Sequence, residues 1–410
     1  MTERTLVGID VGTSKIAALM GVVDADGVPT VVAGASAPAR GMRQGVVVDI
    51  EEVTGALRET LERLEQLSGR AVTTAVLALG GQHVAAANTT GSVALTPGGR
   101  EVRHDDVARA MAVARAAAPL GENRELICQI PRAYRLDDQE GVANPIGMAG
   151  FQLEVETHVV TASQTITQHL IKCAQAARAD PEDLVSAPLA TATAVLSPAE
   201  REMGTLMLDI GAGTTGVALY AAGAPWYSAA LPGGGETITY AIAAGLRVPL
   251  EVAERLKLEH GHCDPPSLAE DDLLPLDDER IVLPQSELAT VIQAQVSELL
   301  AAARAPLRAA QAEGVRPIGV VLTGGTAALP GLTTLAERTL GLPARIGTPQ
   351  GLRGLGEDWA GPAAATVAGL LLWSAHHTEG MRTPAGGRKR HAPGGPLGTQ
   401  VRRALRVLLP

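Results

Sequence analysis

Aromatic residues are nearly absent from this sequence. Three Trp, four Tyr and one Phe occur in 410 residues, so the hydrophobic cores must be built mainly from Ala, Val and Leu. A platform of rings for stacking the bases of single-stranded nucleic acid would need more aromatic side chains. With 46% hydrophobic and 19% charged residues, the chain is globular, and disorder over its whole length is excluded.

Cysteine is also scarce. Cys128, Cys173 and Cys263 are odd in number, lie far apart and show no C-x-x-C spacing, so neither a disulfide framework nor a zinc site is indicated. The one metal-like cluster, residues 260–263, lacks a fourth nearby ligand. No Ser-His-Asp spacing stands out, and the sequence therefore assigns no catalytic residue.

No long hydrophobic run is present. The most apolar helix candidate, residues 363–374, is far shorter than the ~20 residues that span a bilayer, and it is expected to be a core helix. Glu3 and Arg4 lie within the first four residues and are followed by a strand-like run, which does not fit a signal peptide. These features predict a cytoplasmic protein.

Acidic residues outnumber basic ones, 44 to 34, for a net charge of −10. Seven of the basic residues lie in 381–410, where there is no acid, so the rest of the chain has 27 basic and 44 acidic residues. A body this acidic should repel duplex DNA. No nucleic-acid partner is expected, and the basic C-terminal segment needs its own explanation.

The second half of the chain repeats the start of the first half. Residues 5–10 and 205–210 are apolar strand candidates, and each is followed by a polar turn and a second strand. Asp10 and Asp209 occupy equivalent points, 199 residues apart. A repeat of this length is too long for a solenoid and predicts an α/β protein of two duplicated domains that face one another across a cleft.

The repeat also defines a domain organisation. Residues 83–160, with strands expected near 83–89, 125–130 and 151–160 and a helix at 105–117, have no counterpart in the second half. Helices are expected from about Ile50, at 251–257 and at 288–310, with a short strand at 280–283. The predicted parts are a first domain (1–82 and 161–204), an inserted α+β subdomain (83–160), a second domain (205–232 and 318–374), a helical-rich subdomain (233–317), a flexible linker (375–396) and a terminal amphipathic helix (397–410).

Two polar turns could bind phosphate. In the first, Asp10 to Lys15, backbone N–H groups can form a nest for phosphate oxygens, and glycine allows close approach. The second turn, Asp209 to Gly216, has the same parts. The two Asp residues could bind Mg²⁺ through its water shell. The candidate residues are Asp10, Gly12, Thr13, Ser14, Lys15, Asp209, Gly211, Gly213, Thr214 and Thr215.

Each turn leads into a strand rather than a helix, so neither a P-loop nor a Rossmann fingerprint fits. A pair of ordinary hairpins is the alternative. Two further glycine clusters could accept a flat base against the backbone, although both could equally serve turn geometry. These are Gly233 and Gly234, and Gly324, Gly325 and Thr326.

Taken together, these motifs resemble the actin/Hsp70/sugar-kinase superfamily. Residues 231–261 and 320–332, together with the inserted subdomain after Gly81, are similar to the FtsA family of bacterial cell-division proteins, and the resemblance covers about 6–373 and the tail. It implies an actin-like fold that binds ATP with Mg²⁺ in the interdomain cleft. It also implies that Glu254 and Lys257 contact ribose and adenine; an exposed ion pair is the local alternative.

One position departs from the superfamily pattern. In actin and Hsp70, a Gln or Glu in the strand-to-helix turn before the second phosphate motif orients the attacking water. Here that turn is residues 185–190, and the equivalent residue is Ala187. A methyl group cannot orient water, so ATP binding is expected, with at most weak hydrolysis.

The C-terminal segment has one apolar stripe at helical spacing, flanked by arginines. Its 14 residues are too few to span a bilayer but suit the headgroup region of anionic lipid. Docking on the protein's own core is the alternative. The membrane-binding residues expected are Leu397, Val401, Arg402, Arg403, Leu405, Arg406 and Leu408.

The family resemblance implies a function. The protein would polymerise on the cytoplasmic face of the membrane at the division site and bind the C-terminal tail of the tubulin-like FtsZ through the helical-rich subdomain. It would recruit later division proteins through the inserted subdomain. Two alternatives stay open: a pilus-assembly actin homologue, which shares the inserted subdomain, and a small-molecule kinase of the same superfamily, for which no catalytic Asp is identified.

Overall fold

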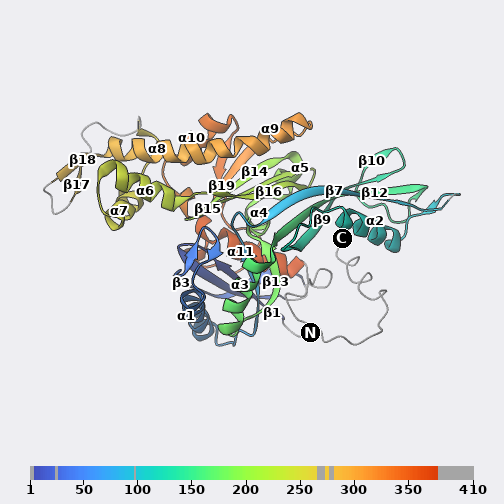
Figure 1. Cartoon of the computed structure of the whole chain (residues 1–410), viewed down its shortest axis with the longest axis horizontal. Helices are drawn as coiled ribbons and strands as arrows, with labels where there is room; N and C mark the ends of the chain where they lie inside the picture. The colour runs from blue at the N-terminus through green and yellow to red at the C-terminus, as the bar shows by residue number, and fades with distance from the viewer. Residues whose placement is uncertain (1–3, 24–25, 97, 266–272, 277–280, 377–410) are drawn as a thin grey trace.

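The computed structural model describes residues 4–23, 26–96, 98–265, 273–276 and 281–376. Two five-stranded sheets form its centre (Figure 1). The first sheet has the order β13-β6-β1-β2-β3. Its strands are β1 (Arg4–Val11), β2 (Lys15–Val23), β3 (Pro29–Pro38), β6 (Thr74–Leu79) and β13 (Asp180–Ser186).

The second sheet has the order β16-β15-β14-β19-β20. Its strands are β14 (Thr205–Ile210), β15 (Thr214–Ala221), β16 (Ala224–Pro232), β19 (Gly319–Thr323) and β20 (Ala344–Ile346). In each sheet the central strand pairs antiparallel with the strand that follows it and parallel with a later one. The two sheets are therefore built alike, which confirms the predicted duplication.

Four helices cover the first sheet: α1 (Ile50–Ser68), α3 (Gln164–Ala176), α4 (Ala187–Val195) and α11 (Ala365–His376). Asp49 caps α1 by accepting from the N–H groups of Glu51 and Glu52, and Gly69 ends it in the left-handed conformation. The predicted stripe of α1 is buried from Val53 to Leu64, whereas Leu67 is 61% exposed. The α3 helix was not predicted.

The inserted subdomain is a four-stranded sheet with the order β10-β9-β12-β7, packed against α2 (His104–Ala116). It projects from one end of the molecule, opposite to α7 and α8 (Figure 1). Its strands run further than predicted. They are β7 (Ala85–Ala94), β9 (Arg124–Leu136), β10 (Gln139–Val142) and β12 (Gln152–Ser163), with a separate short pair, β8 (Arg100–Glu101) and β11 (Ala149–Gly150).

The helical-rich region contains α6 (Gly235–Leu246), α7 (Leu250–His260), α8 (Gln285–Ala302) and α9 (Arg304–Ala312). The single helix predicted at 288–310 was wrong, because the chain breaks at Ala303 between α8 and α9. Pro306 explains the break, since its ring would clash with the carbonyl four residues earlier and it has no N–H to donate. The predicted strand at 280–283 is β18 (Ile281–Pro284), paired with β17 (Leu273–Leu276).

The remaining elements are short: β4 (Met42–Arg43), β5 (Val46–Val47), α5 (Pro198–Met203), η2 (Gly325–Ala328), α10 (Leu332–Leu340), η3 (Glu357–Trp359) and η4 (Pro362–Ala364).

The core helix predicted at 363–374 is α11, which continues to His376 and so into the start of the predicted linker. The rest of that linker and the predicted membrane-binding segment 397–410 lie outside the described residues. In the part of the chain that is described, no helix has the length and apolar character needed to cross a membrane.

Candidate phosphate-binding cleft

The two predicted phosphate turns have the same local structure. The N–H of Gly12 donates to the carbonyl of Lys15 at 3.0 Å, and the N–H of Gly211 donates to the carbonyl of Thr214 at 3.0 Å. A Cβ at Gly12 would lie 2.8 Å from the Lys15 carbonyl oxygen, so a side chain there would strain the turn. The same backbone hydrogen bond therefore closes both turns.

The turns also face one another. A Cβ on Gly213 would come within 2.7 Å of Thr13 Oγ1, so the backbone of the second turn lies against a side chain of the first. The structure thus brings together two turns that are about 200 residues apart in the sequence. Loops that approach from two domains in this way can bind one phosphate chain from both sides.

Two carboxylates lie at this junction. Burial and the nearby charge of Asp209 together raise the pKa of Asp10 to about 7, against the opposing charge of Lys15. Burial also raises the pKa of Asp209, although hydrogen bonds from Thr191 and Thr366 and the charge of Lys15 oppose it. Carboxylate oxygens in such a pair are the donors that Mg²⁺ prefers, and the ion commonly completes its shell with water and phosphate.

These residues therefore fit a hydrated Mg²⁺ bound with a nucleotide. Among the described residues, no group of three or more His, Cys, Asp and Glu side chains is arranged to hold a metal by itself. The histidine and cysteine residues at 260–263 accordingly form no such group.

The glycine clusters converge on the second turn. Gly235 N–H donates to the Gly211 carbonyl at 2.8 Å, and Thr326 Oγ1 donates to the same oxygen at 3.2 Å. Gly324 has a φ of +85°, and a Cβ there would lie 2.5 Å from Asp209 Oδ1, so only glycine suits this position. Gly325 faces open space, since nothing would lie within 4 Å of its Cβ.

Two residues of this group have structural partners. A Cβ on Gly234 would meet the Gly211 carbonyl oxygen at 2.3 Å, so Gly234 lies directly against the second turn. Thr215 is buried, and its hydroxyl donates to the carbonyl of Gly233 at 2.9 Å. Thr215 thus ties the turn to the glycine cluster.

Glu254 and Lys257 do not form the exposed ion pair that was the local alternative. Lys257 is only 8% exposed, and its Nζ lies 2.6 Å from Glu254 Oε2. The same ammonium group donates to the Gly235 carbonyl at 3.0 Å and to Thr239 Oγ1 at 2.8 Å, and Thr239 also donates to Glu254. The pair therefore anchors α7 beneath the glycine cluster that starts α6.

Sequence reasoning missed Thr191 and Thr366, which both donate to Asp209. They lie 18 and 157 residues from it, in helices whose sequences look like plain core segments. The local setting of Ala187 was predicted correctly, since β13 ends at Ser186 and α4 begins at Ala187. A Cβ built on Gly80 would lie 3.9 Å from the Ala187 methyl group.

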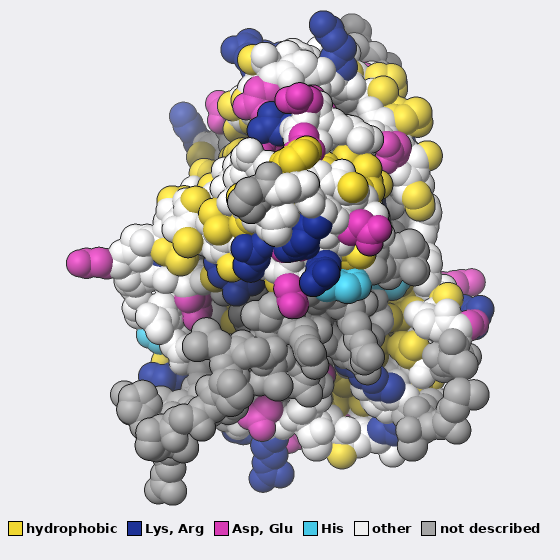
Figure 2. All heavy atoms as spheres, turned by 90° about the vertical axis from the view of Figure 1, so that its right-hand side faces the viewer, with side chains coloured by type: hydrophobic (Ala, Val, Ile, Leu, Met, Phe, Trp, Pro, Cys, Tyr) yellow, Lys and Arg dark blue, Asp and Glu magenta, His cyan; other side chains and the backbone are white. Residues whose placement is uncertain are grey.

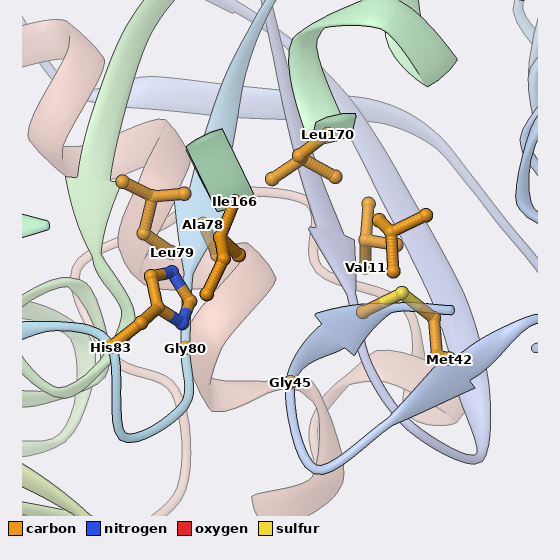
Figure 3. Close-up of a pocket in the computed structure, with 10 residues that line it drawn as sticks. Val11, Met42, Gly45, Ala78, Leu79, Gly80, His83, Ile166 and Leu170 are labelled. Atoms are coloured by element: carbon orange, nitrogen blue, oxygen red, sulfur yellow. The ribbon is translucent and has the colours of Figure 1, made fainter. Parts of the chain in front are cut away.

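A small cavity lies beside the end of β1. It has a volume of about 10 Å³, room for roughly one water molecule, and is lined by Val11, Met42, Gly45, Val47, Ala78, Leu79, Gly80, His83, Ile166 and Leu170 (Figure 3). Both ring nitrogens of His83 are buried, and neither has a hydrogen-bond partner among the described residues. Burial and the charge of Arg124 lower the pKa of His83 to about 4. The cavity is far too small for a nucleotide.

Known proteins match the chain in sequence. Residues 206–369 match the family described as cell division protein FtsA, and residues 81–161 match the SHS2 domain inserted in FtsA. The cell division protein FtsA of Pseudomonas aeruginosa is 34% identical over 94% of this chain and 93% of its own length. That of Borreliella burgdorferi is 33% identical over 91% of each chain.

Solved structures of lower identity share the fold. A chain of the PilM–PilN type IV pilus biogenesis complex superposes with a TM-score of 0.64 at 21% identity, covering 90% of this chain and 98% of that chain. MreB 5 of Spiroplasma citri bound to AMPPNP gives 0.51 at 14% identity, covering 89% and 94%. The MamK double helical filament gives 0.52 at 13% identity, covering 90% and 98%.

The fold neighbours confirm the predicted actin-like architecture, and the match at 81–161 confirms the inserted subdomain. At these low identities they show the fold alone, whereas the FtsA relatives are more than 30% identical over nearly the whole length of both chains. The chain therefore belongs to the FtsA family of cell-division proteins.

Proposed function

We propose that this protein binds ATP with Mg²⁺ in the cleft between its two duplicated domains and assembles on the membrane as part of the division machinery. The observation that carries the proposal is the contact of Gly213 with Thr13, which sets two equivalent phosphate turns face to face. MreB 5, which shares the fold, was solved bound to AMPPNP. Its nucleotide supports the same use of this cleft.

Bound Mg²⁺ would neutralise phosphate charge, and water-mediated contacts to Asp10 and Asp209 would hold it. Lys15 supplies a positive charge at the first turn. Gly233, Gly234, Gly324 and Gly325 would receive the nucleoside, with Glu254 and Lys257 beneath it. Because Ala187 stands where relatives outside this family carry Gln or Glu, ATP acts mainly as a ligand, and hydrolysis is at most weak.

Self-assembly is the second part of the proposal. MamK, a protein of the same fold, forms a double helical filament. A filament of this chain would place many C-terminal segments side by side on a membrane, and weak individual anchors would then add to a strong one. Leu397, Val401, Leu405 and Leu408, with Arg402, Arg403 and Arg406, supply the apolar face and cationic rim.

Partner binding is the third part. Exposed apolar side chains on α6 and α7, Tyr240 (58%), Leu250 (43%) and Leu258 (73%), offer a surface for a short peptide such as the FtsZ tail. On the inserted subdomain, Val113, Leu120 and Phe151 are 44–57% exposed. Figure 2 shows basic, acidic and hydrophobic side chains interspersed at this end of the molecule.

Co-sedimentation with anionic vesicles tests the proposal as a whole. The full chain is mixed with vesicles, with and without Mg-ATP and with and without a peptide of the FtsZ C-terminal tail. We expect vesicle binding that Mg-ATP strengthens and peptide that pellets only with the protein. A chain that neither binds ATP in calorimetry nor pellets with vesicles would refute the proposal.

A further inference from the structure

Two threonines hold a single oxygen of the Asp209 carboxylate. Thr191 Oγ1 donates to Oδ2 at 2.8 Å, and Thr366 Oγ1 donates to the same oxygen at 2.9 Å. The two hydroxyl oxygens are themselves 2.9 Å apart. Thr191 is 0% and Thr366 is 9% exposed, so water does not readily replace either hydrogen bond.

The number of hydroxyl hydrogens limits how many of these three contacts can be hydrogen bonds. Each hydroxyl has one hydrogen to donate, so the two threonines together can make two of the three contacts as donors. When Asp209 is ionised, both hydrogens go to Oδ2, because hydrogen bonds to a charged acceptor are the stronger ones. Among the residues that the structure describes, none donates a hydrogen bond to Oδ1, which lies beside Gly324.

The two threonines come from different helices that touch. Thr191 lies in α4 and Thr366 in α11, and a Cβ on Gly369 of α11 would lie 1.9 Å from the Ala190 carbonyl oxygen of α4. The backbones are thus in contact where the helices cross. Both helices belong to the hydrophobic core of the first sheet, whereas Asp209 is the penultimate residue of β14 in the second sheet. The hydrogen bonds therefore join the two halves of the molecule.

We propose that Thr191 and Thr366 are positioning residues that orient the Asp209 carboxylate, presenting Oδ1 to the water shell of a nucleotide-bound Mg²⁺. This inference rests on the proposed binding of Mg-ATP and adds to it.

The test compares ATP affinity with Mg²⁺ and with EDTA. Thr191→Val and Thr366→Val keep the side-chain shape and remove the hydroxyl. We expect each to lower the Mg²⁺-dependent gain in affinity about tenfold, while affinity in EDTA changes less than about twofold. Thr193→Val is the matched control, because this neighbour on α4 donates to the Leu189 carbonyl and not to Asp209. It should leave the Mg²⁺ gain unchanged.

A purely structural role would give another pattern. Thr191→Ser and Thr366→Ser keep both hydroxyls and lose only a methyl group, and they should retain the full Mg²⁺ gain. In an Asp209→Asn background, either valine change should have no further effect on that gain. Melting curves and far-ultraviolet circular dichroism establish that each variant is folded; if one valine variant does not fold, the other decides.

Several results would overturn the inference. One is an Mg²⁺-dependent gain in ATP affinity that is unchanged in the valine variants, and another is a loss of that gain in the serine variants. A third is a further loss when either valine change is added to Asp209→Asn. A wild-type chain that binds no ATP under either condition would overturn the proposed function and this inference together. Wild-type binding with valine variants indistinguishable from it would overturn this inference alone.

Discussion

His158 of the inserted subdomain and Ser228 of the second sheet are hydrogen-bonded, with 2.8 Å between Nε2 and Oγ. The other ring nitrogen, Nδ1, lies 2.8 Å from Asn88 Oδ1, and the Asn88 amide donates to the Trp226 carbonyl at 2.9 Å. Since Asn88 presents an oxygen, the ring hydrogen is placed on Nδ1, and Nε2 accepts from Ser228. These bonds fasten the inserted subdomain to the edge strand β16.

His158 should make the protein sensitive to acid. Burial, together with the charge of Arg132, lowers its pKa from 6.5 to about 4. Below pH ~6.5, His158 is therefore protonated in the unfolded chain but stays neutral in the folded chain. Its contribution to the free energy of unfolding is full above pH ~6.5 and is lost as the pH falls toward 4. The loss attributable to His158 is about 3 kcal/mol.

Urea denaturation at pH 7 and at pH 4 measures this loss. His158→Gln, which cannot titrate, should lose less stability than wild type between the two pH values, by about 3 kcal/mol. His104→Gln, at an exposed position at the start of α2, is the control and should behave as wild type. Equal losses in wild type and His158→Gln would contradict the prediction.

Gly213→Val should weaken Mg-ATP binding. A side chain at position 213 would press on Thr13 and force the two turns apart. We expect at least a tenfold loss of affinity by calorimetry, about 1.4 kcal/mol, and a similar loss for Asp209→Ala. Gly356→Ala is the control, because nothing lies within 4 Å of its Cβ. Unchanged Mg-ATP affinity in both variants would show that the nucleotide does not bind between these two turns.

Lys257→Met should destabilise the fold. The change leaves the Gly235 carbonyl and Thr239 without the ammonium donor, and Glu254 without its cation. Because Glu254 is 44% exposed and can turn to water, we expect a loss of about 1–3 kcal/mol in the free energy of unfolding. Lys172→Met, at an exposed position, is the control. If Lys257→Met were as stable as wild type, the ion pair of Lys257 with Glu254 would contribute nothing to the free energy of unfolding.

ATP turnover should be slow. Orienting the attacking water contributes much of phosphoryl-transfer catalysis, and the methyl group of Ala187 cannot do it. We expect a phosphate-release assay to give well below ~1 turnover per second, with a faster rate for Ala187→Gln and an unchanged rate for Ala187→Ser. Wild-type turnover above that value would reopen the interpretation as a kinase-like enzyme.

Leu408→Glu should abolish binding to anionic vesicles and leave ATP binding intact, because it puts a charge on the apolar stripe of the C-terminal segment. Removal of residues 397–410 should have the same effect. Thr399→Glu introduces the same charge away from the stripe and should weaken binding only slightly, since each nearby charge changes it by about 1 kcal/mol. A truncated chain that still pellets with vesicles at moderate salt would place the membrane contact elsewhere.

The sequence by itself was sufficient for the duplicated architecture and for locating the two equivalent polar turns. Asp10 and Asp209 end apolar strands and precede glycine-rich turns, and both signals lie within a few consecutive residues. The inserted subdomain was visible because its pattern has no counterpart in the second half. The break between α8 and α9 was also readable in principle, since Pro306 is a local signal, but the helical spacing of the apolar residues masked it.

Only the tertiary structure decided which side chains support the cleft. Thr191 and Thr366 lie in helices whose other residues are mostly apolar, and nothing near them in the chain marks them as partners of Asp209. Lys257 and Glu254 have the spacing of an exposed pair, yet packing of α7 under α6 buries the lysine. Sequence patterns record interactions between near neighbours, whereas these contacts form when distant helices pack and their few polar groups must find partners away from water.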